Sequence, residues 1–387
     1  MAQYASLTPG DPAPWFKQRS FSNPNYNFDV AAGRYVVLCF FASAADPHAQ
    51  AAMRAMRERE GFFDDKQGCF FGVSVDSRDE SEKRAADHYP GHRLIWDFDC
   101  KVSRLYGAIP KDVAGAIDAN LLRRFWVVLD PTLRIIAVVP FARDRSDVDQ
   151  VAQLIETLPP PGHTAGFEVQ APILVLPNVF EPELCRDLIG RYEEHGGMES
   201  GFMREVDGKT VTAHDYGHKR RRDYVIADPN VISATQDRFV RRVTPMIQRA
   251  HQFKVTRMER YIVSCYSAED GGHFRPHRDN TTKGTAHRRF AVSVNLNDDF
   301  DGGEVSFPEY GPRSFKAPTG GAVVFSCSLL HSVSKVTRGR RFAFLPFLYD
   351  DEAAKVREMN ASAIEDPALR YQGSGTEGAA EATPDAG

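Results

Sequence analysis

The feature that most constrains the fold is a proline-rich break near the middle of the chain. Residues 158–172 read "LPPPGHTAGFEVQAP", with four prolines beside glycines and small residues. Proline cannot continue a helix or a central strand, so we place a domain boundary here. The 387 residues are enough for two cores. The break predicts a first domain, a linker, a second domain and a C-terminal segment, with limits at 1–158, 159–170, 171–352 and 353–387.

The two sides of the break carry different hydrophobic patterns. Before it, short apolar runs such as "RYVVLCFFAS" (34–43) alternate with longer polar segments. Runs that are apolar throughout fit strands covered on both faces, and the polar segments fit helices, so this half predicts an α/β layer. After residue 255, apolar runs follow one another with only turn residues between them, which predicts an antiparallel double sheet or jelly roll. Residues 371–387 have almost no aliphatic bulk and are predicted to be disordered.

Composition argues against two kinds of partner. The 48 basic and 52 acidic side chains give a formal charge of -4, which offers no general attraction to nucleic acid or to an anionic membrane. No stretch approaches the ~20 apolar residues that span a bilayer, and the start of the chain lacks a signal-peptide pattern, so we expect a cytoplasmic protein. The six cysteines form no C-x-x-C pair and most lie in apolar runs, so we expect buried, reduced thiols.

Residues 271–280, "GGHFRPHRDN", contain half of a metal-ligand pattern. In an extended chain, side chains two apart point the same way, so His277 and Asp279 can reach one point while Arg278 faces elsewhere. H-x-D by itself would indicate a surface pair, because a catalytic metal needs a third ligand. His331 supplies one directly after the apolar run "GGAVVFSCSLL". Two histidines and one carboxylate form the facial triad of non-haem Fe(II) oxygenases, so we predict that His277, Asp279 and His331 are catalytic metal ligands.

Arg341 lies ten residues after His331. This even spacing would put both side chains on one face of an extended segment. A guanidinium beside an iron with open positions suits a dicarboxylate cosubstrate, because its fork can bind the remote carboxylate through two hydrogen bonds. We predict this role for Arg341, against the alternative of a surface arginine in the run "RGRR".

Residues from about 170 to 350 resemble the 2-oxoglutarate and Fe(II)-dependent oxygenases of the prolyl 4-hydroxylase type. The matching segments are "PILVLPNVFEPELCRDLI", "YSAEDGGHFRPHRDN", "SVNLNDDFDGGEVSFPEYG" and "PTGGAVVFSCSLLHSVSKVTRGRRFAF". The resemblance implies a double-stranded β-helix in which the triad binds iron and Arg341 holds the C5 carboxylate of 2-oxoglutarate. It also implies that Tyr266 lines the cosubstrate pocket, although a plain core aromatic is the alternative. Asn295 stands where several relatives carry a tyrosine.

The same resemblance implies a reaction. We expect a dioxygenase that uses Fe(2+), 2-oxoglutarate and O2, hydroxylates a prolyl residue or another amino-acid-like substrate, and releases succinate and CO2. The substrate, a small molecule or a peptide or protein, is left open, as are ascorbate binding and its use as reductant. Relatives also carry an arginine-containing stretch near the mouth of the iron pocket. The basic segment "GHKRRRDYVIADP" (217–229) leaves three interpretations open. It is a solvated loop, a phosphate-binding patch, or, by the resemblance, a place where Arg220 or Arg222 meets an anionic part of the substrate.

Residues 7–158 resemble the peroxiredoxin branch of the thioredoxin fold, through segments such as "LTPGDPAPWF", "YVVLCFFAS" and "FWVVLDPTLRIIAV". Members of that branch carry a reactive cysteine just after the first long strand, where this chain reads "ASAADPHAQ". Cys39 lies inside an apolar run, which quiets a thiol. We therefore predict a redox-inactive domain used for docking, pocket shaping or homodimerisation. A thiol peroxidase and a non-catalytic binding protein built from degenerate domains are the alternatives.

Overall fold

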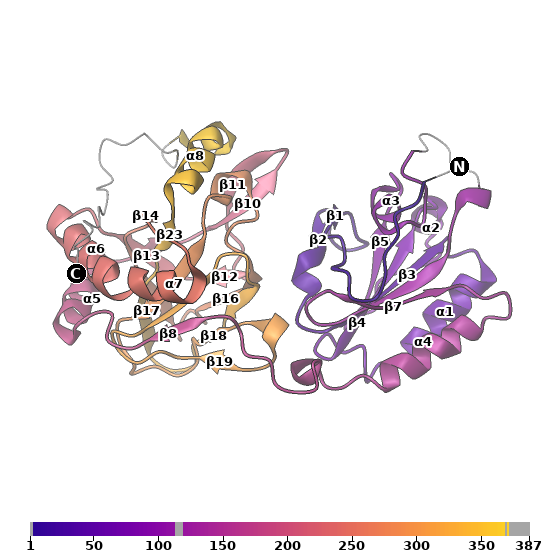
Figure 1. The fold of residues 1–387 in the computed structure, drawn as a ribbon, viewed down its shortest axis with the longest axis horizontal. Coiled ribbons are helices and arrows are strands. Elements are labelled where there is room, and N and C mark those ends of the chain that lie inside the picture. The colour runs from indigo at the N-terminus through magenta and orange to yellow at the C-terminus, as the bar shows by residue number, and fades with distance from the viewer. Residues whose placement is uncertain (1–2, 113–118, 368–369, 371–387) are drawn as a thin grey trace. The chain divides into compact units, whose positions relative to one another are not determined.

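The computed structural model describes residues 3–112, 119–367 and 370 of the chain. The chain divides into two compact units, residues 1–171 with 308–312 and residues 172–307 with 313–387 (Figure 1). The predicted disordered tail, residues 371–387, lies outside the described residues. Among the helices of the described part, none is long and apolar enough to cross a membrane.

The first unit contains a five-stranded sheet in the order β5-β4-β3-β6-β7. β3, β4 and β5 are parallel neighbours, and β6 and β7 extend the sheet antiparallel. The strands are β3 (Tyr35–Ala42), β4 (Gly68–Ser74), β5 (His92–Trp96), β6 (Phe125–Leu129) and β7 (Ile135–Pro140), beside a small hairpin of β1 (Lys17–Gln18) and β2 (Tyr26–Asn27). The helices are α1 (Pro47–Arg57), α2 (Arg78–Ser81), α3 (Lys101–Tyr106) and α4 (Ser146–Glu156), with 3-10 turns η1 (Phe28–Ala31), η2 (Ala119–Leu121) and η3 (Pro161–His163).

Helices cover this sheet on both faces. α1 and α4 lie side by side on one face, where Met53 and Val151 belong to one buried core (Figure 1). On the other face Tyr106 of α3 packs on Phe40 of β3, with ring centroids 5.1 Å apart. Because both faces are buried, β3 and β4 are apolar along almost their whole length. The predicted thioredoxin-like fold class is confirmed for this unit.

The second unit is a double-stranded β-helix of two antiparallel sheets, as predicted. Its nine-stranded sheet runs β14-β23-β17-β22-β15-β13-β9, with β20 paired to β17 and β8 paired to β20; its five-stranded sheet runs β12-β16-β21-β18-β19. The larger sheet contains β8 (Leu174–Leu176), β9 (Met198–Glu199), β13 (Arg222–Val225), β14 (Arg257–Glu259), β15 (Ile262–Ser267), β17 (Phe290–Asn295), β20 (Ala322–Ser326), β22 (Arg340–Phe344) and β23 (Phe347–Tyr349). The smaller sheet contains β12 (Lys219–Arg220), β16 (His273–His277), β18 (Val305–Ser306), β19 (Ser314–Phe315) and β21 (His331–Val333). A separate hairpin joins β10 (Phe202–Val206) to β11 (Lys209–Ala213).

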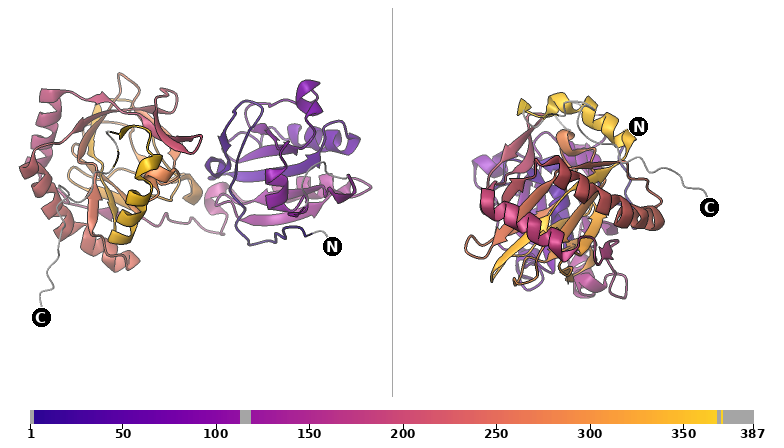
Figure 2. Two further views of the ribbon diagram at one scale, coloured as in Figure 1. Left: turned by 90° about the horizontal axis from the view of Figure 1, so that it is seen from above. Right: turned by 90° about the vertical axis from the view of Figure 1, so that its left-hand side faces the viewer.

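Three helices lie along one side of these strands (Figure 2). They are α5 (Pro182–His195), α6 (Pro229–Arg242) and α7 (Thr244–His251); α8 (Asp351–Met359) and the 3-10 turns η4 (Lys283–Thr285), η5 (Pro308–Tyr310) and η6 (Ala361–Ala363) complete the described elements. Leu188 and Phe239 of the helices share one buried core with Val263 and Phe342 of the larger sheet. Because strand side chains alternate, the neighbouring residues in β15, β17 and β22 face the other way, into the β-helix. Five of those inward positions are polar and buried, namely Ser264, Tyr266, Ser293, Asn295 and Arg341.

A buried ion cluster fixes the end of this unit. The Glu259 carboxylate, 4% exposed, accepts hydrogen bonds from His287 Nε2 at 3.0 Å and Arg288 Nε at 2.9 Å, and pairs with Arg357 at 3.0 Å. Burial alone would raise the pKa of Glu259, but Arg288 and His287 outweigh it and hold that pKa below its ordinary value. The carboxylate thus joins β14 to α8 and to the segment before β17.

We expect Glu259→Gln to lower the free energy of unfolding by about 3–5 kcal/mol, because it leaves buried cations without their counter-ion. Calorimetric unfolding measures the effect. The control is Glu352→Gln, which removes an exposed pair with Lys355 on α8 and should cost less than about 1 kcal/mol. Equal effects of the two changes would contradict the role given to Glu259.

Candidate metal centre

Three side chains of the second unit converge on one point. His277 ends β16, Asp279 follows two residues later, and His331 begins β21; strand pairing sets His277 opposite His331. Their ligand atoms all lie within 4.8 Å of one another. Asp279 Oδ1 is 3.6 Å from His277 Nε2, and Asp279 Oδ2 is 3.3 Å from His331 Nε2. The structure therefore brings together the three residues that the sequence singles out.

Hydrogen bonds fix the tautomer of both imidazoles. His277 Nδ1 lies 2.7 Å from the Arg275 carbonyl oxygen, and His331 Nδ1 lies 3.0 Å from the Leu329 carbonyl oxygen. A carbonyl can only accept, so each Nδ1 carries the proton and each Nε2 offers a lone pair toward Asp279. Two Nε2 atoms and one carboxylate on one side of a point are the donor set that Fe(II) takes in a facial triad. The residues present fit this metal.

The protonation states agree with this donor set. Burial and the neighbouring His331 lower the pKa of His277 well below its ordinary value. Burial would raise the pKa of Asp279, but His331 and His277 outweigh it and lower that pKa. Metal ligands must be neutral imidazoles and ionised carboxylates, and the directions of these two shifts favour those states for His277 and Asp279.

Arg341 is buried without an acidic partner. Arg341 is the second residue of β22, and only 2% of its surface is exposed. Its Nε donates to Asn295 Oδ1 at 3.0 Å and one terminal nitrogen donates to Ser293 Oγ at 2.6 Å. The other terminal nitrogen, NH1, has no hydrogen-bond partner, and no carboxylate of the described residues forms an ion pair with this guanidinium. A buried guanidinium with an unused donor fits an external carboxylate.

The partners of Arg341 were only partly visible in the sequence. Asn295 accepts a hydrogen bond from Arg341 through its Oδ1 and donates one through its Nδ2 to the Ala317 carbonyl at 2.7 Å. Ser293 was missed. Its signal is the spacing "SVN", which puts residues 293 and 295 on the same face of β17.

Tyr266 lies directly beside Arg341. The two residues pair across β15 and β22, and the Arg341 guanidinium carbon is 5.4 Å from the centre of the Tyr266 ring. Tyr266 is 1% exposed, belongs to a small core with Phe274 and Val333, and accepts a hydrogen bond from Arg221 at 3.3 Å through its hydroxyl. Both interpretations of Tyr266, core aromatic and pocket wall, are compatible with this position.

Comparison with known proteins decides the family. Residues 261–349 match the model of the 2OG-Fe(II) oxygenase superfamily, and residues 9–138 match that of the AhpC/TSA family. A PKHD-type hydroxylase of Gluconobacter oxydans is 31% identical over 182 residues, which cover 44% of this chain and 75% of the relative. The chain belongs to the PKHD-type 2OG-Fe(II) hydroxylases. A PKHD-type hydroxylase of Cupriavidus metallidurans is 29% identical over 182 residues, with the same shares of the two chains.

Solved structures resemble each unit at low sequence identity. A prolyl-4-hydroxylase of Pseudomonas putida is 15% identical with a TM-score of 0.34, over 46% of this chain and 93% of that one. AhpC of Mycobacterium tuberculosis is 19% identical with a TM-score of 0.32, over 39% of this chain and 93% of that one.

As a PKHD-type hydroxylase the protein is a 2-oxoglutarate-dependent dioxygenase, and its family works with Fe(2+), 2-oxoglutarate and O2.

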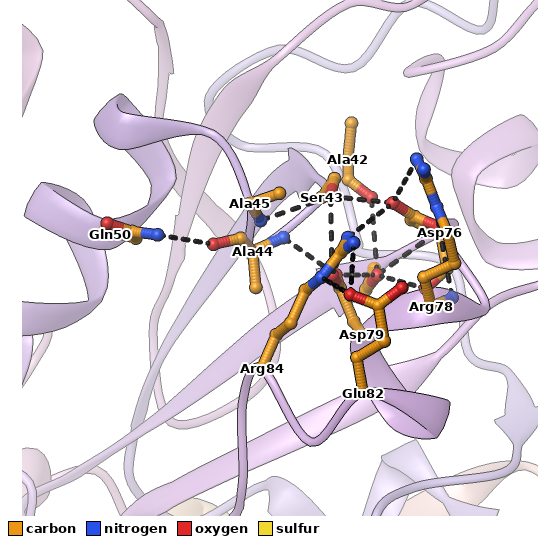
Figure 3. A network of polar contacts seen from close by, with 11 residues as sticks. Ala42, Ser43, Ala44, Ala45, Gln50, Asp76, Arg78, Asp79, Glu82 and Arg84 are labelled. Atoms are coloured by element: carbon orange, nitrogen blue, oxygen red, sulfur yellow. Dashed lines mark hydrogen bonds and ion pairs between the residues drawn. The ribbon is translucent and has the colours of Figure 1, made fainter.

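In the first unit of this hydroxylase, the loop after β3 contains no thiol. Ser43 Oγ donates to Asp76 at 2.9 Å, and the Ala44 N–H donates to Asp79 at 2.7 Å (Figure 3). Asp79 is fully buried and also accepts from Ser74 Oγ at 2.7 Å. The loop is thus held by carboxylates at the place where peroxiredoxin-like domains carry their cysteine.

Asp46 and His48, to which the sequence assigns no role, have structural ones. Asp46 caps α1 by accepting from the His48 and Ala49 N–H groups at 2.8 and 3.2 Å, and it pairs with Arg124 at 2.8 Å. The His48 Nε2 is 2.9 Å from the buried Asp147 carboxylate. The positive end of the helix is therefore already occupied by a carboxylate of the chain itself.

All six cysteines lie in the described residues, and all are free and buried. Burial raises the pKa of Cys39 well above its ordinary value and raises that of Cys69 and Cys100. In the second unit, burial raises the pKa of Cys185 and of Cys265 to about 11. Burial therefore disfavours the reactive thiolate form of these five cysteines.

We expect the native protein to react only slowly with a thiol reagent such as 5,5′-dithiobis(2-nitrobenzoate) at neutral pH, because a thiol reacts as the exposed thiolate. Absorbance of the released dye follows the reaction, and unfolding in guanidinium should release all six equivalents. A rapidly reacting thiol in the native protein would instead support the thiol-peroxidase alternative.

Proposed function

We propose that His277, Asp279 and His331 hold Fe(II), and that Arg341 binds the remote carboxylate of 2-oxoglutarate in a pocket bordered by Tyr266. The observation that carries this proposal is the buried Arg341 guanidinium, which keeps an unused N–H donor and lacks a carboxylate partner in the described part of the chain. Tyr266 connects it with the triad, because Tyr266 and Phe274 share one core and the Phe274 ring stacks on His277 at 3.5 Å.

We further propose hydroxylation of a prolyl residue or another amino-acid-like substrate, with release of succinate and CO2. When bound, Fe(II) would activate O2 with 2-oxoglutarate as the co-reductant, so that one oxygen atom of O2 enters succinate and the other enters the hydroxyl group of the product. The chain's own residues orient the reactants: carbonyl oxygens fix the imidazoles, and Ser293 and Asn295 fix the Arg341 fork.

Further parts of the sequence prediction stand as proposals. The domain limits 1–158 and 171–352, a cytoplasmic location, ascorbate as reductant and a homodimer through the first domain belong here. Six free buried cysteines support a reducing compartment. The carboxylate-filled loop after β3 supports a first domain without redox activity.

Replacing any one of His277, Asp279 and His331 by Ala should abolish Fe(II)- and 2-oxoglutarate-dependent succinate formation, because two remaining ligands do not hold the metal. Succinate release and iron content are measured on the same samples. His195→Ala, at the exposed end of α5, is the matched control and should keep both. Iron-dependent succinate formation that persists in any triad variant would refute the assignment.

Arg341→Ala should raise the 2-oxoglutarate requirement by some tens to thousands of fold while leaving iron binding nearly intact, since truncating one side of a buried charge pair costs about 2–5 kcal/mol. Arg341→Lys should rescue only partly, because it keeps the charge and loses the fork. Arg340→Ala is the control: its neighbouring side chain is half exposed and pairs with Glu193 at 2.6 Å. An unchanged requirement in Arg341→Ala would move the anchor to Arg340 or Arg338.

A further inference from the structure

Two cationic side chains of the basic segment 217–229 are buried inside the β-helix. Lys219 and Arg221 are 6% and 8% exposed, whereas Arg220 is half-buried and Arg222 is exposed. A substrate contact of Arg220 or Arg222 is one of the three interpretations that the sequence analysis left open for this segment. Burial distinguishes the four residues, because only Lys219 and Arg221 have their side chains enclosed by the surrounding chain.

Arg221 is held firmly but keeps one free donor. One of its terminal nitrogens bonds Asp223 at 2.7 Å and Ser200 Oγ at 3.1 Å, and the other donates to the Tyr266 hydroxyl at 3.3 Å. Its Nε is buried without a hydrogen-bond partner. A buried N–H without an acceptor is costly, so this donor marks a place where a ligand atom can bind.

Lys219 is a buried cation without a counter-ion. Its Nζ donates to Ser200 Oγ at 2.8 Å and to the Gly201 carbonyl at 2.5 Å. Of the carboxylates in the described ranges, none forms an ion pair with this ammonium group. An ammonium group has three donors, so one remains after these two bonds.

The cluster as a whole carries excess positive charge. Asp223 is shared by Arg221 and by the partly buried Arg260, which lies 3.4 Å from it, so two guanidinium groups pair with this one carboxylate. Burial and the neighbouring Arg221 lower the pKa of Lys219 well below its ordinary value, although Asp223 and Asp279 act in the opposite direction. The site therefore favours an added anion, because buried charges need counter-ions.

This cluster borders both parts of the proposed active site. Lys219 Nζ lies 5.0 Å from the centre of the Phe274 ring, and that ring stacks on His277 at 3.5 Å. Arg221 bonds Tyr266, whose ring lies 5.4 Å from the Arg341 guanidinium carbon. An anion bound by Lys219 and Arg221 would thus lie near the triad and apart from the donor of Arg341.

We propose that Lys219 and Arg221 form a second carboxylate-binding subsite, which binds the substrate that is hydroxylated. The inference rests on the proposed function, because Arg341 is then occupied by 2-oxoglutarate and a second anion needs other donors. It narrows the substrate class to amino-acid-like molecules that carry a carboxylate. Two sources share this chemistry: the α-carboxylate of a free amino acid, and an acidic side chain next to the reacting residue of a peptide.

The test is calorimetric titration of the full-length protein loaded with Fe(II) and 2-oxoglutarate under anaerobic conditions, so that no turnover occurs. Two matched pairs of probes separate the sources: L-proline with L-prolinamide, and the blocked peptide Gly-Pro-Glu with Gly-Pro-Gln. In one pair the carboxylate-bearing member should bind at least about tenfold more tightly, as expected for a charge-assisted contact. Lys219→Met and Arg221→Met should remove this preference, and Arg220→Met should keep it.

Two checks keep the outcome decisive. Lys219→Met removes a charge that has no counter-ion, so it should fold even if Arg221→Met, which leaves Asp223 with a weaker partner, does not. The affinity for 2-oxoglutarate should be unchanged in Lys219→Met. The proposal is overturned if neither pair shows a preference, if neither pair binds, or if the variants weaken 2-oxoglutarate binding alone. A wild-type protein that takes up no Fe(II) and 2-oxoglutarate would overturn the proposed function as well.

Discussion

The pairing of β16 with β21 is the contact on which the candidate metal centre depends. It sets His277 opposite His331, and a bond of 3.0 Å from the Asp279 N–H to the Cys327 carbonyl holds the carboxylate-bearing turn against the end of β20. A one-residue shift would turn one imidazole to the other face of the sheet. The irregular register between Phe274 and His277 lets both side chains stack on the inner side of the same strand.

The interior of the second unit combines a hydrophobic shell with polar inner walls. Alternate residues of the larger sheet pack on α5, α6 and α7, while their neighbours, among them Ser293, Asn295 and Arg341, turn inward. This arrangement costs stability, because buried cations need partners that the chain does not fully supply. Part of that cost comes from the buried N–H donors of Arg221 and Arg341 that have no hydrogen-bond partner, and the anions proposed for these positions would offset it. Departures from full internal pairing are expected at functional sites.

The first unit combines a thioredoxin-like fold with a loop after β3 that contains no cysteine. Its sheet order and helical layers are thioredoxin-like, and its sequence matches the AhpC/TSA family. After β3, however, the chain contains alanines and Asp46, whose carboxylate caps α1. Asp76 and Asp79 accept hydrogen bonds from Ser43 and Ala44 of this loop. Function follows from such a site and not from the surrounding layers. The oxygenase chemistry of this chain is therefore located in the second unit.

The sequence by itself determined the fold class of both units, because strands buried on both faces and strands separated by turns give different hydrophobic patterns. It also singled out His277, Asp279, His331 and Arg341, since side chains two apart in an extended segment point the same way. Only the tertiary structure decided which cations of "KRRRD" are buried, that Ser293 and Asn295 hold Arg341, and that Lys219 lacks a counter-ion. Those facts depend on which strands become neighbours across long stretches of chain, and local spacing carries no information about that pairing.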